Sequence, residues 1–396
     1  MKNLYIIGAG MGHIDDLTAL AQNIIKKCNV VYGSSRLSEQ YKCLNNNINV
    51  PAYSEIITKI ENDNNENIAL LVSGDTSFFS LTKLVIERLD NKFNIEVISG
   101  ISSMQYLLSK VKLSANNVKI VSLHGRESSA IGAVSYNEYT FLLTGGKAKA
   151  HNVINELYEA GLENVHIYAG ENMHLENERI LSDNIKNMLN IEFMDLTVLL
   201  IYNKDYSNPH IHFRDTEFTR GKAPMTKEDV RWLSADYLNI EPSDIVYDIG
   251  AGTGSCAIEF AGRAYDGIVY AIEKEDEAFE LININKANLK RYNIVSIKGE
   301  APAILENIKT PDKVFIGGSS KTMSQIFKMV YEKNNNVVIC VTAITLETLS
   351  SAMESFKLYN VEPEVTCINS AKSKKAGPYH MMMGNNPVYI ITGKLQ

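Results

Sequence analysis

Residues 246–255, Val-Tyr-Asp-Ile-Gly-Ala-Gly-Thr-Gly-Ser, decide the fold of the C-terminal half of this chain. An apolar run typical of a buried strand leads into three glycines in two-residue steps, and an apolar helical pattern follows. Glycine is needed where the backbone turns tightly and a ligand approaches without a Cβ in the way. The free N–H groups at the start of the next helix favour a hydrogen-bond acceptor. The stretch therefore predicts the first turn of a ligand-binding α/β unit.

The glycine spacing and one acidic residue downstream narrow the choice of ligand. Gly250, Gly252 and Gly254 form G-x-G-x-G, whereas the dinucleotide fingerprint is G-x-G-x-x-G. About 20 residues beyond the turn, Glu273 ends the next expected strand, where a carboxylate can accept from both hydroxyls of a ribose. The spacing disfavours NAD, and the acid favours a ribose-containing ligand. The alternative is a βα turn that holds no ligand.

The C-terminal part alternates between expected strands and helices. Five strands are expected at 245–247, 268–272, 294–297, 313–316 and 336–341, and two late ones at 364–368 and 388–392. This order is typical of a doubly wound parallel sheet with an antiparallel edge. A helix is expected to start at Thr226, where Asp229 three residues on resembles a capping box.

The N-terminal part predicts a separate α/β region. Eight strands are expected there, at 4–7, 30–32, 68–73, 95–98, 118–122, 140–143, 165–169 and 197–202. Residues from about 204 to 223 lose apolar periodicity and gather Asn, Pro, His and charges, which indicates a linker. We therefore expect domains at 1–205 and 223–396, joined by residues 206–222.

Composition restricts the class of protein. A chain of 396 residues exceeds what one core usually supports, so two domains are expected. The net charge of −7 argues against a general nucleic-acid partner, and no apolar run is long enough to span a membrane. The five cysteines are scattered without a CxxC pair or a histidine at ligand spacing, so no metal site is predicted. We expect a cytoplasmic protein with reduced thiols.

The C-terminal motifs resemble those of class I S-adenosylmethionine (SAM)-dependent methyltransferases. Two further segments, Pro224-Met-Thr-Lys-Glu-Asp-Val-Arg231 and Val314-Phe-Ile-Gly-Gly-Ser-Ser320, resemble the decarboxylating module of the precorrin-6Y C(5,15)-methyltransferase family. The resemblance covers residues 222–396 and implies a Rossmann-like class I fold. It implies a SAM site formed by Thr226, Asp248, Gly250, Ala251, Gly252, Thr253, Gly254, Glu273, Glu300 and Ala301. It implies substrate contacts at Lys227, Arg231, Gly317, Gly318 and Ser319.

The N-terminal half opens on a second glycine turn, Gly8-Ala-Gly-Met-Gly12, which alone is equally a structural turn. Further motifs follow expected strands: Ser73-Gly-Asp-Thr-Ser-Phe-Phe79, Ser99-Gly-Ile-Ser-Ser103, Leu123-His-Gly-Arg126 and Leu143-Thr-Gly-Gly146. Together they resemble the tetrapyrrole methylase family over residues 1–205, a fold of two α/β subdomains with SAM in the cleft between them. The usual proline after the second glycine is replaced by Met11, which leaves the shape of the loop open.

This second resemblance implies its own site residues. SAM would be surrounded by Asp75, Phe78, Ser102, Ser103 and Ala169, and Gly10 and Gly12 would border the substrate. His124 and Arg126 are either substrate contacts or an exposed helix entry.

Two unrelated methyltransferase types in one chain imply a bifunctional enzyme of corrin biosynthesis. It would use one SAM per domain to methylate carbons 5 and 15 of precorrin-6B or cobalt-precorrin-6B, and it would decarboxylate the ring C acetate. An electron-rich meso carbon needs no strong base from the protein, which agrees with the lack of a catalytic dyad, so no catalytic residue is assigned. A homo-oligomer is expected from the resemblance alone. The alternatives are a two-domain methyltransferase for another substrate and a SAM-binding protein with one inactive domain.

A substrate with many carboxylates predicts a cationic rim despite the acidic total charge. Two basic stretches fit this prediction: His210, His212, Arg214, Arg220, Lys222, Lys227 and Arg231 around the linker, and Lys372, Lys374, Lys375 and His380 in the acid-free tail. For the lysines of the tail, a solvated face is an equal alternative.

Overall fold

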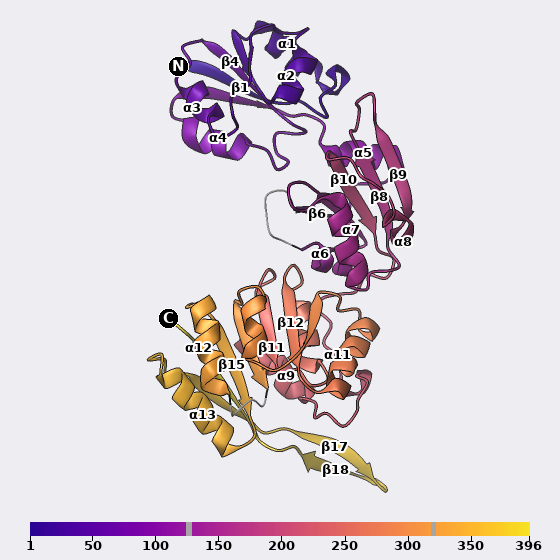
Figure 1. Cartoon of the computed structure of the whole chain (residues 1–396), viewed down its shortest axis with the longest axis vertical. Coiled ribbons are helices and arrows are strands. Elements are labelled where there is room, and N and C mark those ends of the chain that lie inside the picture. Colours follow the sequence, from indigo (N-terminus) through magenta and orange to yellow (C-terminus); the bar gives the residue numbers. More distant parts are fainter. Residues whose placement is uncertain (124–128, 318–321) are drawn as a thin grey trace. The chain divides into compact units, whose positions relative to one another are not determined.

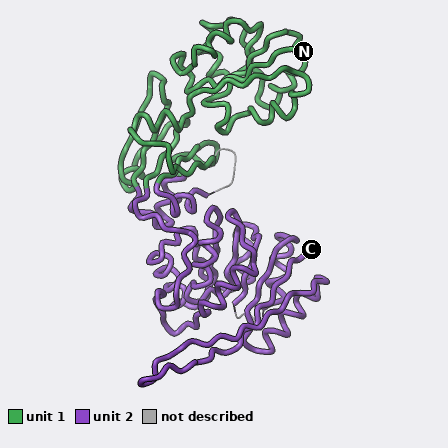
Figure 2. The backbone as a smooth tube through the Cα atoms, turned by 180° about the vertical axis from the view of Figure 1, so that it is seen from behind, with its two compact units in different colours: residues 1–126, 139–152, 166–202 green, residues 127–138, 153–165, 203–396 purple. Residues whose placement is uncertain are grey.

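The computed structural model describes residues 1–123, 129–317 and 322–396 (Figure 1). They form two compact units, shown in Figure 2: an N-terminal unit of residues 1–126, 139–152 and 166–202, and a C-terminal unit of residues 127–138, 153–165 and 203–396. Each compact unit is thus built from several segments of the chain. The division into functional domains at residues 1–205 and 223–396 remains a proposal. In the described ranges, no helix combines the length and apolar character needed to cross a membrane.

The first sheet of the N-terminal unit is parallel throughout, in the order β3-β2-β4-β1-β5. Its strands are β1 (Lys2–Gly8), β2 (Val30–Tyr32), β3 (Ile48–Asn49), β4 (Asn67–Val72) and β5 (Phe93–Ile98). The interior strand β1 is apolar from Leu4 to Ile7 because it is covered on both faces, so Ile6 packs into one core cluster and Ile7 into another.

The second sheet of this unit has the order β6-β7-β10-β8-β9, and only β6 and β7 are parallel. Its strands are β6 (Val118–Ser122), β7 (Tyr139–Leu143), β8 (His166–Glu171), β9 (Arg179–Asn184) and β10 (Thr197–Tyr202). The helices before residue 200 are η1 (Ile14–Asp16), α1 (Ala19–Lys27), α2 (Ser35–Tyr41), α3 (Ile56–Glu61), α4 (Thr82–Leu89), α5 (Ser103–Val111), α6 (Ile131–Tyr136), α7 (Ala150–Glu159) and α8 (Ile185–Met188).

The C-terminal unit contains one seven-stranded sheet in the order β13-β12-β11-β14-β15-β19-β16. Its strands are β11 (Ile245–Ile249), β12 (Ile268–Glu273), β13 (Ile294–Lys298), β14 (Lys313–Gly317), β15 (Val338–Ala343), β16 (Glu364–Ile368) and β19 (Val388–Lys394). The first five in this order are parallel, and β19 lies antiparallel between β15 and β16. The prediction of a doubly wound sheet with an antiparallel edge is confirmed.

Helices cover both faces of this sheet. They are η2 (Asp215–Glu217), α9 (Glu228–Tyr237), α10 (Ser255–Arg263), α11 (Asp276–Asn288), η3 (Ala303–Asn307), α12 (Met323–Lys333) and α13 (Leu346–Lys357). Because side chains alternate along a strand, Tyr247 and Ile249 of β11 pack on the side of α12 and α13, and Val246 packs on the side of α9 and α10. A hairpin of β17 (Ala371–Ala376) and β18 (Tyr379–Gly384) extends as an arm and is exposed at every residue (Figure 1).

One local prediction in this unit was wrong. Helix α9 begins at Glu228 after Lys227, and no side chain caps it, so Thr226 and Asp229 do not form a capping box. The expected linker is packed into the C-terminal unit, because Phe213 and Phe218 are buried in its core. The buried guanidinium of Arg291 also donates to the carbonyl oxygens of Asn208, Pro209 and Ile211 at 3.2–3.3 Å.

Candidate functional site

A cavity of about 1190 Å³ opens at the carboxyl ends of β11, β12 and β14 in the C-terminal unit. This is the edge at which open α/β sheets bind ligands. Segment 222–227 and residues 384–386 also line it. The volume exceeds the ~300–1,000 Å³ of a typical small-molecule pocket, so a cofactor and part of a second molecule fit together.

The glycine turn forms part of the cavity wall. Gly250, Gly252 and Gly254 have φ values of +74°, +55° and +77°, which residues other than glycine rarely adopt. A Cβ on Gly250 would lie 2.6 Å from the carbonyl oxygen of Gly317, and one on Gly252 would lie 3.2 Å from that of Pro224. The turn therefore requires glycine both for its dihedral angles and for the close approach of neighbouring backbone.

Glu273 lies at the end of β12 with its carboxylate directed back to the turn. Its Oε2 accepts from the Gly252 N–H at 2.8 Å, and its Oε1 accepts from the N–H groups of Lys274 and Glu275 at 2.8 and 3.0 Å. The residue is 8 % exposed and lines the cavity. Since each carboxylate oxygen can accept two hydrogen bonds, Oε2 keeps capacity for a ligand hydroxyl.

Asp248 lies on β11 at the base of the cavity and is fully buried. Neither of its carboxylate oxygens has a hydrogen-bond partner among the described residues. Burial raises the pKa of this carboxyl to about 7. An unpartnered buried carboxylate is costly for the fold, so a ligand that brings a hydrogen-bond donor or a positive charge would be bound favourably here.

The cavity brings together most of the residues predicted for the C-terminal site. Its lining includes Thr226, Lys227, Asp248, Gly250, Ala251, Gly252, Glu273, Glu300, Ala301 and Gly317. Thr253 and Gly254 are not among the described lining residues; Gly254 packs against Ile282 at the start of α10. Gly318 and Ser319 lie outside the described residues.

Arg231, which was predicted to contact substrate, is fully buried and is not among the described residues that line the cavity. Its side chain is fully buried in α9 and donates to Asp215 Oδ1 at 2.8 Å and to the Thr226 carbonyl at 3.0 Å. It also donates to the Phe213 carbonyl and lies over the ring of Phe218. A guanidinium committed to these partners holds segment 213–226 against α9 and has no exposed surface for a substrate.

The predicted cationic rim is absent from the part of the cavity wall that the structure describes. That wall carries three lysines and six carboxylates: Lys222, Lys227, Lys274, Asp248, Glu273, Glu275, Asp276, Glu277 and Glu300. Arg214 and Lys372 from the two basic stretches pair with Glu228 instead, at 3.2 and 2.6 Å. Burial would raise the pKa of Glu228, but hydrogen bonds from Lys372, the Asp215 N–H and Arg214 lower it to about 2.

In the N-terminal unit, a second group of predicted residues meets where β1, β4 and β5 end. Gly10 exchanges two backbone hydrogen bonds with Gly74, at 3.1 and 2.8 Å, and the next residue, Asp75, accepts from the Gly100 N–H at 2.8 Å. Burial would raise the pKa of Asp75, but hydrogen bonds from Ser77 and Gly100 hold it below its usual range. Ser102 caps α5 in a capping box with Gln105, and Ser103 is the first residue of that helix.

The other N-terminal predictions fall elsewhere. Phe78 packs toward Phe141, with ring centroids 6.0 Å apart, in the core cluster of the second sheet. Ala169 is buried on β8. Gly12 has φ +107° and lies near Arg36. His124 and Arg126 lie outside the described residues.

Several cavity residues carried no signal in the sequence analysis. Thr342 lies near the end of β15 and Ile344 follows it, and Asn385 and Asn386 precede β19. The turn Gly-Asn-Asn-Pro at 384–387 marks a break between strands, but its place at the cavity depends on the insertion of β19 next to β15.

A parallel sheet with a three-glycine turn, an acid at the end of the next strand and a cavity between them define a Rossmann-like ligand-binding unit. The Precorrin methyltransferase domain family matches residues 217–393, and the Tetrapyrrole (Corrin/Porphyrin) Methylases family matches residues 3–189.

Curated relatives match a little under half of the chain. A probable cobalt-precorrin-6B C(15)-methyltransferase (decarboxylating) of Saccharolobus solfataricus is 40 % identical over 181 residues, 43 % of this chain and 88 % of that protein. A protein of the same description from Pyrobaculum calidifontis is 33 % identical over 193 residues, 47 % of this chain and 96 % of that protein. The solved structure of a precorrin-6Y C5,15-methyltransferase from Geobacter metallireducens is 34 % identical, with a TM-score of 0.44, and covers 47 % of this chain and 96 % of that one. The chain belongs to the precorrin methyltransferase family.

Proposed function

We propose that this chain is a bifunctional SAM-dependent methyltransferase of corrin biosynthesis. Its C-terminal unit would methylate carbon 15 of precorrin-6B or cobalt-precorrin-6B and decarboxylate the ring C acetate, and its N-terminal unit would methylate carbon 5. The observation that supports this most is the cavity that joins the glycine turn, Glu273 and Asp248 in a chain of this family. The relatives named above are described as acting at carbon 15 or at carbons 5 and 15.

The hydrogen-bond acceptors that line the cavity fit SAM. The carboxylate of Glu273 is suited to the ribose hydroxyls, because Oε2 has acceptor capacity left beside the Gly252 N–H. The unpartnered carboxylate of Asp248 is suited to the cationic amino-acid end of the cofactor. The absence of a Cβ at Gly250 and Gly252 lets the carbonyl groups of Gly317 and Pro224 approach closely, so that the glycine turn can form this wall of the cavity.

Bound SAM supplies an electrophilic methyl group on its sulfonium. The task of the chain's own residues is then to hold the acceptor carbon in line with that group and to keep water away, since positioning can supply much of the rate. Lys222 and Lys227 are exposed and line the cavity, and we propose that each pairs with one peripheral carboxylate of the substrate. In the N-terminal unit, we propose that Asp75, Ser102 and Ser103 bind the second SAM beside the loop of Gly10 and Gly12.

The test combines product mass with two site variants. The full chain is incubated with SAM and either precorrin-6B or cobalt-precorrin-6B, and the product is weighed by mass spectrometry. We expect the gain of two methyl groups and the loss of one CO2. Glu273→Gln should lower C-terminal turnover and SAM affinity by about 10–100-fold, because a charged hydrogen-bond acceptor to the ligand is lost. Its product should then carry only the N-terminal methyl group and keep its acetate.

A matched control is Glu332→Gln, which removes an exposed carboxylate of α12 whose i,i+4 partner is Lys328, and which should leave both reactions unchanged. Asp75→Asn should produce the opposite pattern from Glu273→Gln, with decarboxylation retained and one methyl group missing. A wild-type product with one methyl group would show that one unit is inactive. The proposal requires one SAM in each unit, so a unit that does not bind SAM would refute it.

A further inference from the structure

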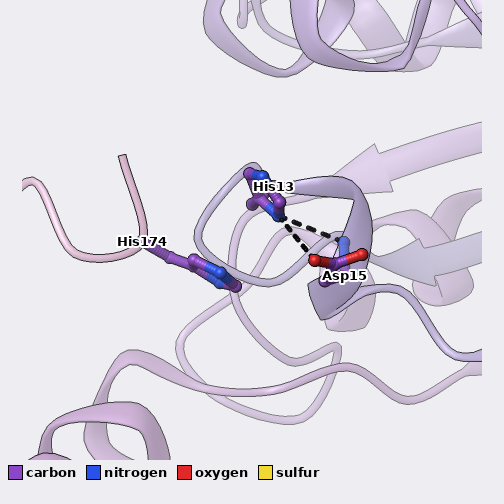
Figure 3. Close-up of side chains that lie close together, drawn as sticks. All are labelled: His13, Asp15 and His174. Atoms are coloured by element: carbon purple, nitrogen blue, oxygen red, sulfur yellow. Dashed lines mark hydrogen bonds and ion pairs between the residues drawn. The ribbon is translucent and has the colours of Figure 1, made fainter. Parts of the chain in front are cut away.

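A cluster of metal-ligand side chains lies in the N-terminal unit, beside the first glycine turn. His13 and Asp15 follow that turn, and His174 comes from the turn after β8 (Figure 3). The imidazole rings of His13 and His174 face each other with centroids 4.3 Å apart. One ligand atom from each of the three residues lies within 4.8 Å of the others.

His174 is held in the orientation of a metal ligand. Its Nδ1 lies 2.7 Å from Oδ1 of Asp16, whose side chain is buried and whose Oδ2 accepts from the Met11 N–H at 2.9 Å. When Nδ1 donates to this carboxylate, Nε2 carries the lone pair. A carboxylate that orients a histidine through its other nitrogen is the usual support of a metal-bound imidazole.

The backbone and ring of His174 are also fixed. Its φ of +60° is uncommon for a residue other than glycine, and its N–H donates to Glu178 at 2.6 Å. Its ring is stacked on Tyr106 as well as on His13. Strain of this kind persists only where the surroundings hold the residue, and it is concentrated at ligand sites.

The remaining two groups can close around an ion. Tetrahedral Zn²⁺ with Zn–N distances of about 2.0–2.1 Å needs ligand atoms about 3.3 Å apart, so the cluster must contract by about 1–1.5 Å. The side chain of Asp15 is 77 % exposed and that of His13 is 39 % exposed, so both can rotate without disturbing the core. The bond from the Asp15 N–H to His13 Nδ1 is long, at 3.3 Å, and is readily given up.

We propose that His13, His174 and Asp15 bind one divalent transition-metal ion of the zinc type, with Asp16 orienting His174. Two imidazoles and one carboxylate suit Zn²⁺, Co²⁺ or Ni²⁺, and they do not suit Mg²⁺ or Ca²⁺, which prefer all-oxygen sites. Three protein ligands leave a fourth position for water or another ligand. The ion would join the loop of residues 10–16 to the turn of residues 172–178. This inference does not depend on the proposed methyl transfer.

The test uses Co²⁺ and Zn²⁺ alone with the full chain. The exposed thiols Cys43 and Cys367 can bind zinc nonspecifically, so both are first changed to serine. We expect one Co²⁺ per chain, with the intense visible absorption of a tetrahedral site, and displacement of that absorption by Zn²⁺. His13→Ala should abolish the signal, and Asp16→Asn should weaken binding by about 10–100-fold.

The matched control is His166→Ala, which removes a half-buried histidine on β8 that pairs with Ser182 and lies outside the cluster. It should leave binding unchanged. Because Asp16 also supports the loop, thermal unfolding without metal shows whether its variant is folded, and His13→Ala, at an exposed side chain, carries the main test. Binding of Co²⁺ with equal affinity by His13→Ala or His174→Ala, or no binding at one equivalent, would overturn the proposal.

Discussion

The two glycine turns of this chain share the spacing G-x-G-x-G and yet form different structures. In the C-terminal unit, Gly254 is followed directly by α10, and the N–H of Gly252 is bound by Glu273 from the neighbouring strand. In the N-terminal unit, Gly12 is followed by His13 and a short 3-10 helix, and the loop is closed by the buried carboxylate of Asp16, which accepts from Met11.

The difference teaches that glycine spacing specifies a tight turn and leaves open what the turn is used for. The residues that follow decide this. An apolar helical pattern directly after the third glycine presents a helix N-terminus at the turn, as at Ser255. After Gly12, the run His-Ile-Asp-Asp at 13–16 instead forms a short 3-10 helix that places the carboxylate of Asp16 inside the loop. The first α-helix therefore begins only at Ala19. Related sequences usually have proline at the position of Met11, after the second glycine. Proline has no N–H and could not donate to Asp16 as Met11 does.

The largest effect is expected from Gly250→Ala. The new Cβ would lie 2.6 Å from the Gly317 carbonyl oxygen, at a φ of +74°. We expect a loss of more than about 3 kcal/mol of unfolding free energy of the C-terminal unit, because both strain and a backbone clash arise. The unit contains the chain's single tryptophan, Trp232, so fluorescence during urea unfolding reports on it.

Gly377→Ala is the control for this prediction. Gly377 also has a positive φ, of +62°, but an added Cβ would have no described atom within 4 Å. It should cost only about 1 kcal/mol. Equal losses for the two variants would mean that the close approach of Gly317 has no energetic importance.

The second prediction concerns the pH dependence of stability at Asp248. Burial raises its pKa from 3.8 to about 7 in the folded chain, so the favourable contribution of the protonated form is complete below about 3.8 and is lost as the pH rises through 7. Asn is neutral at every pH. Without ligand, the unfolding free energy of wild type should therefore fall relative to that of Asp248→Asn as the pH rises. We expect this difference to grow by about 2–3 kcal/mol from pH 5 to pH 8. Urea unfolding followed by Trp232 fluorescence at the two pH values measures this.

Asp75 in the N-terminal unit should show the opposite pH dependence of stability. Its pKa is held below the usual value by hydrogen bonds, so its contribution is present above about pH 4 and is lost as the pH falls further. Asp75→Asn should lower stability at pH 8, as followed by far-ultraviolet circular dichroism. If Asp248→Asn shows the same pH profile as wild type, the carboxyl of Asp248 is not destabilised by burial.

The smallest effect is expected from Met11→Pro in the first turn. Proline removes the N–H that donates to Oδ2 of Asp16 at 2.9 Å and leaves a buried carboxylate with one hydrogen bond fewer. We expect a loss of about 1–2 kcal/mol in the N-terminal unit. Met11→Leu keeps the N–H and the apolar contacts, so it should cost less. Thermal unfolding of the two variants compares them, and equal midpoints would contradict the role given to this hydrogen bond.

The sequence by itself determined the features that are local. All fifteen predicted strands are present within a few residues, because each is a short apolar run bounded by turn residues. The C-terminal glycine turn and Glu273 could be assigned to one cavity, because adjacent parallel strands bring their carboxyl ends to the same edge. The exposed strands β17 and β18 were missed, because they lack the apolar pattern of a buried strand.

Only the tertiary structure decided the features that depend on partners distant in sequence. The positive charge of Arg231 and its place in a segment that resembles the family predicted a contact with substrate. The folding of segment 213–226 over α9 buries its side chain against Asp215 instead. Asn385 reaches the cavity because β19 inserts between β15 and β16. His13 meets His174 because the turn after β8 packs against the first loop. Periodicity and spacing describe neighbours along the chain, whereas these contacts are set by the order of the strands in each sheet and by the packing of side chains within each unit.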